Sequence, residues 1–145
     1  MDARTSYRAA AVRGADPLRL VIFLYEQVVE DVRRALAALR RGDIETRTRE
    51  INHALNVIAH LQGTLDTDLG GEVARHLHRF YNLVRKGLVE AQFQQSAELL
   101  EEQIAQLVTV REAWLEVQRV NSAPVVPPPR PSSSDIQSSV SEWSA

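Results

Sequence analysis

Prolines frame one long stretch of this chain. Of the six prolines, Pro17 stands alone and the other five lie between Pro124 and Pro131. Because proline breaks a helix or a central strand, the residues between these positions are free to form uninterrupted secondary structure. Apolar residues there recur every three or four positions, the period of an amphipathic helix. No alternating pattern typical of a strand competes, so the stretch predicts an all-α protein.

Turn signals divide this stretch into four helices. Asp16-Pro17 is a typical start, with Asp16 able to cap free amide groups and Pro17 at the position where its missing N–H costs nothing. Arg40-Arg41-Gly42 is a typical end, and Asp43 can cap the next helix. Gly70-Gly71 marks the next turn, and the last helix opens near Ser96. We expect helices over about residues 17–41, 44–66, 71–93 and 96–118.

Four helices of similar length with short connections predict an antiparallel up-down four-helix bundle over residues 16–119. Residues 1–15 form a short N-terminal arm with too few apolar residues for a fifth helix. Residues 120–145 are rich in proline and serine, a composition typical of a disordered tail. The aromatic residues on or beside the apolar stripes are expected in the core: Tyr25, Phe80, Tyr81 and Trp114.

Composition restricts the function classes. A chain of 145 residues suits one domain, and a formal charge of −2 gives no general attraction to nucleic acid or to an anionic membrane. The absence of cysteine excludes disulfides and thiolate chemistry. No apolar run is long enough for membrane insertion, and the N-terminus lacks the apolar core of a signal peptide. We therefore expect a cytoplasmic protein.

Residues 65–81 gather acidic residues and histidines around Gly70-Gly71, which raises the question of a metal site. A calcium loop starting at Asp66 would need an oxygen ligand where Gly70 stands and a glutamate where Leu77 stands. His76 and His78 point roughly 160° apart on a helix, so they cannot share a metal. We expect no metal here and solvated histidines.

A di-iron bundle would need two Glu-x-x-His motifs on facing helices. Only Glu50 to His53 has this spacing, since Glu72 and His76 are four residues apart. His53 and His60 lie off the apolar stripe and are expected to face solvent. The chain also lacks a nucleophile elbow and a phosphate-binding glycine loop. We expect no enzyme, no cofactor and no small-molecule substrate, with a carboxylate-bridged metal bundle enzyme as a minor alternative.

The arginine pairs on the first helix could suggest a nucleic-acid surface. However, Glu26, Glu30 and Asp31 share the helix with Arg33-Arg34. This mixture indicates a solvated face of both signs rather than a basic patch. We expect no nucleic-acid partner.

The two ends of the chain leave alternatives open. In the tail, VVPPPRP could dock into an aromatic groove as a polyproline segment, or could have no partner. In the arm, Tyr7 stands alone. It either anchors the arm on the bundle or covers a groove that a partner later fills.

Several short motifs follow one another in a characteristic order. The first block consists of Tyr7, Val12-Arg13-Gly14-Ala15-Asp16-Pro17 and Leu24-Tyr25-Glu26. The middle block consists of Ile58, Leu61, Thr64-Leu65-Asp66, Gly70-Gly71-Glu72-Val73-Ala74 and Phe80-Tyr81. The last block is Val110-Arg111-Glu112-Ala113-Trp114. From Tyr7 to about Val117 the chain resembles the flagellar secretion chaperone FliS family. Gly14, Asp16, Phe80 and Val110 depart from the family pattern, and the tail lies outside it.

The resemblance implies a cytoplasmic chaperone that binds the disordered C-terminal segment of flagellin, prevents premature polymerisation and escorts the subunit to the flagellar type III export apparatus. Export-gate components or a regulatory protein are further candidate partners. Such binding needs neither covalent chemistry nor ATP. By helical phase and resemblance, the expected flagellin contacts are Tyr7, Val12, Leu20, Leu24, Tyr25, Ile58, Leu61, Leu65, Leu77 and Tyr81. The alternative is a non-enzymatic four-helix adaptor for another amphipathic helix.

Overall fold

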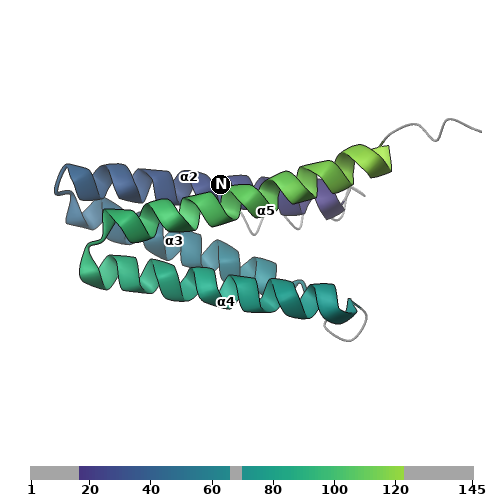
Figure 1. The fold of residues 1–145 in the computed structure, drawn as a ribbon. Coiled ribbons are helices and arrows are strands. Elements are labelled where there is room, and N and C mark those ends of the chain that lie inside the picture. Colours follow the sequence, from purple (N-terminus) through teal and green to yellow (C-terminus); the bar gives the residue numbers. More distant parts are fainter. Residues whose placement is uncertain (1–16, 66–69, 123–145) are drawn as a thin grey trace, which may run out of the picture.

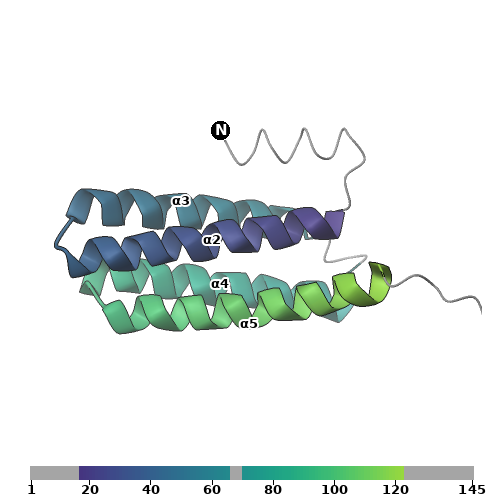
Figure 2. The ribbon, with the colours of Figure 1, turned by 90° about the horizontal axis from the view of Figure 1, so that it is seen from above.

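The computed structural model describes residues 17–65 and 70–122, and these form four helices and no strand. The helices are α2 (Pro17–Arg40), α3 (Ile44–Gly63), α4 (Gly71–Gln94) and α5 (Ala97–Ser122). They run alternately up and down (Figures 1 and 2). α2 packs against α3 and α5, and α4 packs against the same two helices, so α2 and α4 lie diagonally opposite. The predicted all-α bundle is confirmed.

The turn between α2 and α3 uses the residues that the sequence indicated. Gly42 has a φ of +76°, a left-handed conformation that glycine adopts without a steric penalty. Asp43 accepts a hydrogen bond of 3.0 Å from the backbone amide of Thr46. That bond is the largest of the causes that lower the pKa of Asp43 to about 2, and the side chains of Thr46 and Arg41 add to it. At the connection between α4 and α5, the hydroxyl of Ser96 caps α5 by accepting a 3.1 Å hydrogen bond from the backbone amide of Leu99.

Two helix ends differ by more than one residue from the expected positions. α3 ends at Gly63 instead of residue 66. The hydroxyl of Thr64 donates a 2.7 Å hydrogen bond to the carbonyl of Leu61, which satisfies a terminal carbonyl and closes the helix early. α5 continues to Ser122, beyond both the expected helix end and the expected start of the tail. No residue from 119 to 122 breaks a helix, and the first breaker is Pro124.

Apolar side chains of all four helices form one core. Tyr25 and Tyr81 are fully buried, and Phe80 and Trp114 pack partly buried against the same cluster, as predicted. Two large apolar residues near the starts of helices are exposed: Ile44 is 61% exposed and Val73 is 67% exposed. Both lie in the first turn of a helix, where the apolar face extends beyond the helices that pack against it.

α4 and α5 are close at the turn that joins them and diverge toward their other ends (Figure 1). We call that other end of the bundle the open end: there α2 and α4 begin, and α3 and α5 finish. Gly87 on α4 faces the side chain of Gln103 on α5: a Cβ at residue 87 would lie 2.3 Å from the amide nitrogen of Gln103, so that side chain would have to move. None of the helices in the described part of the chain is apolar enough over sufficient length to cross a membrane.

Candidate partner-binding surface

A tyrosine pair crosses the core between the diagonal helices. The hydroxyl of Tyr25 donates a hydrogen bond of 2.7 Å to the hydroxyl of Tyr81, and the ring centroids are 6.0 Å apart. Burial raises the pKa of both phenols. For Tyr25, the hydroxyl of Tyr81 and the indole of Trp114 partly oppose this rise. The indole N–H of Trp114 itself has no partner in hydrogen-bonding geometry among the described residues.

The structure divides the predicted flagellin contacts into three groups. Fully buried in the core are Leu24, Tyr25, Ile58, Leu61 and Tyr81. Partly buried are Leu20, Leu65 and Leu77. Outside the described residues are Tyr7 and Val12. A partner could reach the buried group only after the bundle rearranges, whereas it could touch the partly buried group directly.

The partly buried group shares one place in the fold. Leu20 lies in the first turn of α2, Leu65 follows α3, and Leu77 lies in the second turn of α4. In an antiparallel bundle these positions all lie at the open end. Helix residues near the same end are also exposed and apolar: Phe23, Val73, Val117 and Val120.

The polar contacts between α2 and α3 correct two expectations. Asp31, assigned from sequence to a solvated face, is fully buried. His53, expected to face solvent, is only partly exposed, and its Nδ1 contacts a carboxylate oxygen of Asp31. Gln27 donates a 3.0 Å hydrogen bond to the other oxygen. Asp31 and His53 lie off the apolar stripes. However, the close packing of α2 on α3 covers positions beside a stripe as well as those on it.

Neither histidine of the 65–81 stretch is buried: His76 and His78 are exposed, as expected. His60 is partly buried, although it was expected to face solvent. Asp66 and Asp68 lie outside the described residues. Within residues 17–65 and 70–122, no group of three or more histidine, aspartate or glutamate side chains is placed to hold a metal ion.

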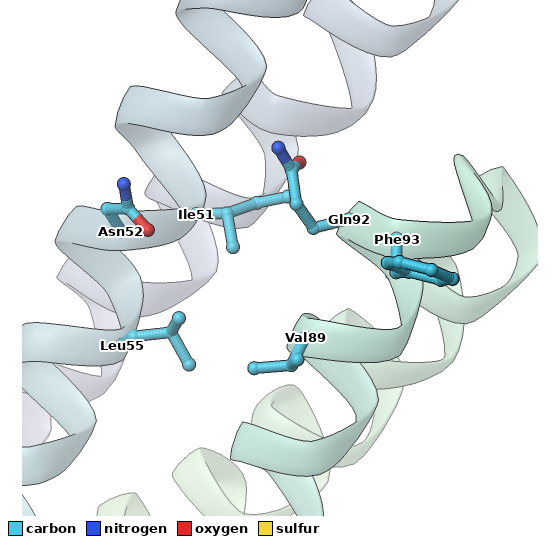
Figure 3. Close-up of a pocket in the computed structure, with 6 residues that line it drawn as sticks. All are labelled: Ile51, Asn52, Leu55, Val89, Gln92 and Phe93. Carbon is cyan, nitrogen blue, oxygen red and sulfur yellow. The ribbon is translucent and has the colours of Figure 1, made fainter.

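A groove that the sequence reasoning missed lies between α3 and α4, at the end opposite the open end. Its volume is about 230 Å³. In Figure 3, Leu55 and Val89 face each other across it from the two helices, and Phe93 stands beside them. The remaining lining residues are Ile51, Asn52 and Gln92. Val89 and Phe93 form an i, i+4 apolar pair off the core stripe of α4, a signal that a search for a second stripe would have found.

Comparison with known proteins identifies the family of this bundle. The family model described as flagellar protein FliS matches residues 1–121. The chain belongs to the FliS family. Residues 122–145 lie beyond the FliS match, and all four described helices fall within it apart from the last residue of α5.

Individual relatives agree with the FliS match. The chain is 34% identical over 105 residues to flagellar secretion chaperone FliSB of Pseudomonas aeruginosa, covering 72% of this chain and 83% of the relative. It is 33% identical over 101 residues to FliS of Campylobacter jejuni, covering 70% and 79%. It is 29% identical over 109 residues to FliS of Salmonella typhimurium, covering 74% and 81%. The FliS family and the helical bundle together support a flagellar export chaperone.

Proposed function

We propose that this protein binds the C-terminal segment of flagellin in the cytoplasm, keeps it from polymerising and escorts it to the flagellar export apparatus. The observation that carries the proposal is the FliS match over residues 1–121, which includes the arm and nearly all of the bundle. The mechanism is non-enzymatic: the chaperone covers apolar helix faces of a client that would otherwise associate with other subunits.

The proposed client surface is the open end. Leu20, Leu65 and Leu77 are partly buried there, and Phe23 is 46% exposed. A client helix that covers these side chains removes apolar area from water, the main favourable term in most protein association. Because the folding of a disordered client is coupled to this burial, part of the interaction energy is spent on ordering it, which favours a reversible complex.

The N-terminal arm joins the bundle at the same end, because it precedes Pro17. Val12 and Tyr7 are close enough to Pro17 along the chain to reach across the open end, at about 3.3–3.6 Å per extended residue. The arm is therefore proposed to occupy part of the client surface until flagellin displaces it. Residues buried in the core, such as Tyr25 and Tyr81, would support this surface or join it after a local rearrangement.

The proposal is tested by mixing the full-length chain with the C-terminal segment of flagellin from the same organism. The expected result is a one-to-one complex in size-exclusion chromatography with light scattering. Leu77→Ser should weaken binding about tenfold or more, since one lost apolar contact of about 1.5–3 kcal/mol corresponds to at least that factor.

Leu83→Ser is the matched control, because Leu83 lies on the same helix and is 63% exposed, away from the start of α4. It should leave the affinity unchanged. Both variants are checked for helical content by circular dichroism. If the chain shows no flagellin binding at about micromolar concentration, a range typical of transient partners, the adaptor alternative replaces this proposal.

A further inference from the structure

The groove between α3 and α4 exposes apolar surface far from the open end. Phe93 is 89% exposed and Val89 is 54% exposed. A phenyl ring left almost fully in water beside other apolar side chains is typical of a docking surface. The residues that line the groove carry no charge: they are four apolar side chains and two amides.

The size of the groove limits what it can hold. Its volume of about 230 Å³ lies below the roughly 300–1,000 Å³ of small-molecule pockets. Such a groove suits one or two side chains from a peptide. It lies along two helices, the setting in which an amphipathic helix inserts apolar residues spaced i, i+4 and i+7.

The C-terminal segment of this chain carries that spacing. Ile136, Val140 and Trp143 stand at i, i+4 and i+7, and the residues between them are serine, glutamine and glutamate. The preceding Ser-Ser-Ser-Asp ends at Asp135, a residue type that favours the start of a helix. This segment lies beyond the FliS match, which ends at residue 121. The FliS family therefore gives no role to this segment.

We propose that residues 136–143 of the chain dock into the α3–α4 groove of the same molecule, with Ile136, Val140 and Trp143 against Leu55, Val89 and Phe93. The contact is intramolecular. The tether holds the segment at an effective concentration on the order of millimolar, so a few apolar contacts suffice to keep it bound.

The connecting residues are long enough for this contact. α5 carries the chain away from the groove for 26 residues, about 39 Å at 1.5 Å per residue. The groove lies about one turn before the end of α4, so the return distance is about 35–40 Å once the roughly 8–10 Å between neighbouring helices is included. Residues 123–135, with their proline run, span about 40 Å at 3.1 Å per residue. A polyproline segment is stiff enough to keep most of that length.

The absence of cysteine makes disulfide trapping a direct test. In the full-length chain, Asn52→Cys is combined with Ser144→Cys. Asn52 lines the groove and is exposed, and Ser144 follows Trp143, so the proposed anchors stay intact. The matched control combines Arg79→Cys with Ser144→Cys. Arg79 is exposed on α4, about 20 Å nearer to the open end at 1.5 Å per residue, and therefore nearer to the end of α5.

At dilute protein concentration, the intramolecular disulfide should form at least about tenfold faster with Asn52→Cys than with Arg79→Cys, after normalisation to the alkylation rate of each thiol. Adding Trp143→Ser should abolish the difference, and adding Ser138→Ala, off the apolar face, should leave it. Circular dichroism checks that each variant folds. Equal rates at the two positions would overturn the proposal, because an undocked tail would reach Arg79 at least as readily. Disulfides formed only between chains would also overturn it and would assign the groove to a second copy.

Discussion

Tyr25 of α2 donates a hydrogen bond of 2.7 Å to Tyr81 of α4, and so joins the two helices that lie diagonally across the bundle. Both side chains are almost completely buried. The bond lets two hydroxyl groups lie in an apolar core, where an unpaired one would be costly.

The tyrosine pair predicts a non-additive response to mutation. Tyr81→Phe leaves the hydroxyl of Tyr25 without its acceptor and should destabilise the fold by about 1–3 kcal/mol. Tyr25→Phe with Tyr81→Phe removes both hydroxyl groups and should cost less than the two single changes added together. Urea unfolding followed by circular dichroism measures each variant. A double variant whose cost equals the sum would contradict an energetic coupling.

The same pair predicts weakening of the fold at alkaline pH. Burial raises the pKa of both phenols above the usual 10.0. The unfolded chain therefore loses these protons near pH 10 while the folded chain keeps them, so the free energy of unfolding falls as pH rises above about 10. Urea midpoints at pH 9 to 11, about the range around the unfolded pKa, should drop more for the natural chain than for the double phenylalanine variant. Parallel pH profiles would rule out this origin.

Because Asp31 is buried, replacing the partly exposed His53 should destabilise the fold more than replacing an exposed histidine. His53→Ala removes a contact of a fully buried acid and should destabilise the bundle by about 1–3 kcal/mol. His76→Ala is the control, because His76 is exposed and should change stability by less than about 0.5 kcal/mol. Thermal unfolding of the two variants distinguishes these outcomes. Equal melting temperatures would mean that Asp31 is satisfied without His53.

Two helical glycines should respond in opposite directions. Gly87→Ala places a Cβ against the side chain of Gln103 and should cost about 1–3 kcal/mol. Gly63→Ala meets no atom within 4 Å and should be neutral or should stabilise the fold by about 0.5–1 kcal/mol. Adding Gln103→Ala to Gly87→Ala should recover most of the loss. Chemical denaturation measures all three variants, and a failure of that rescue would show that another contact forbids a side chain at residue 87.

Deletion of the residues before Ala15 tests whether the arm covers the client surface. If it does, flagellin affinity should rise, because the client no longer competes with the arm, while the helical content stays the same. Isothermal titration with the flagellin C-terminal segment measures the affinity. An unchanged dissociation constant would show that the arm does not control access.

The sequence predicted the helices well because their signals are local. Caps such as Asp43 and Ser96 act on amide groups two or three residues away, and the glycines at the turns act through their own backbone. The apolar period also identified the core aromatics. The end of α3 was missed by three residues, since Thr64 closes that helix through a local hydrogen bond to Leu61 that a periodic pattern does not reveal.

The predicted contact residues illustrate a different limit. Helical phase separates an apolar face from a polar one, but it does not separate the fully buried Leu24 from the partly buried Leu20. That difference depends on where neighbouring helices end and how far they diverge. Asp31 and His53 were misassigned for the same reason, because the covering residue in each case comes from another helix.

The sequence alone therefore determined the helical class, the order and approximate limits of the helices, and the family, since these depend on residues close together in the chain. Only the tertiary structure decided that Tyr25 meets Tyr81, that Asp31 is buried against His53, and that Phe93 is left in water beside a groove. Each of these outcomes depends on the separation and tilt of two helices. That geometry results from packing the apolar faces of all four helices together, so no single stretch of residues determines it.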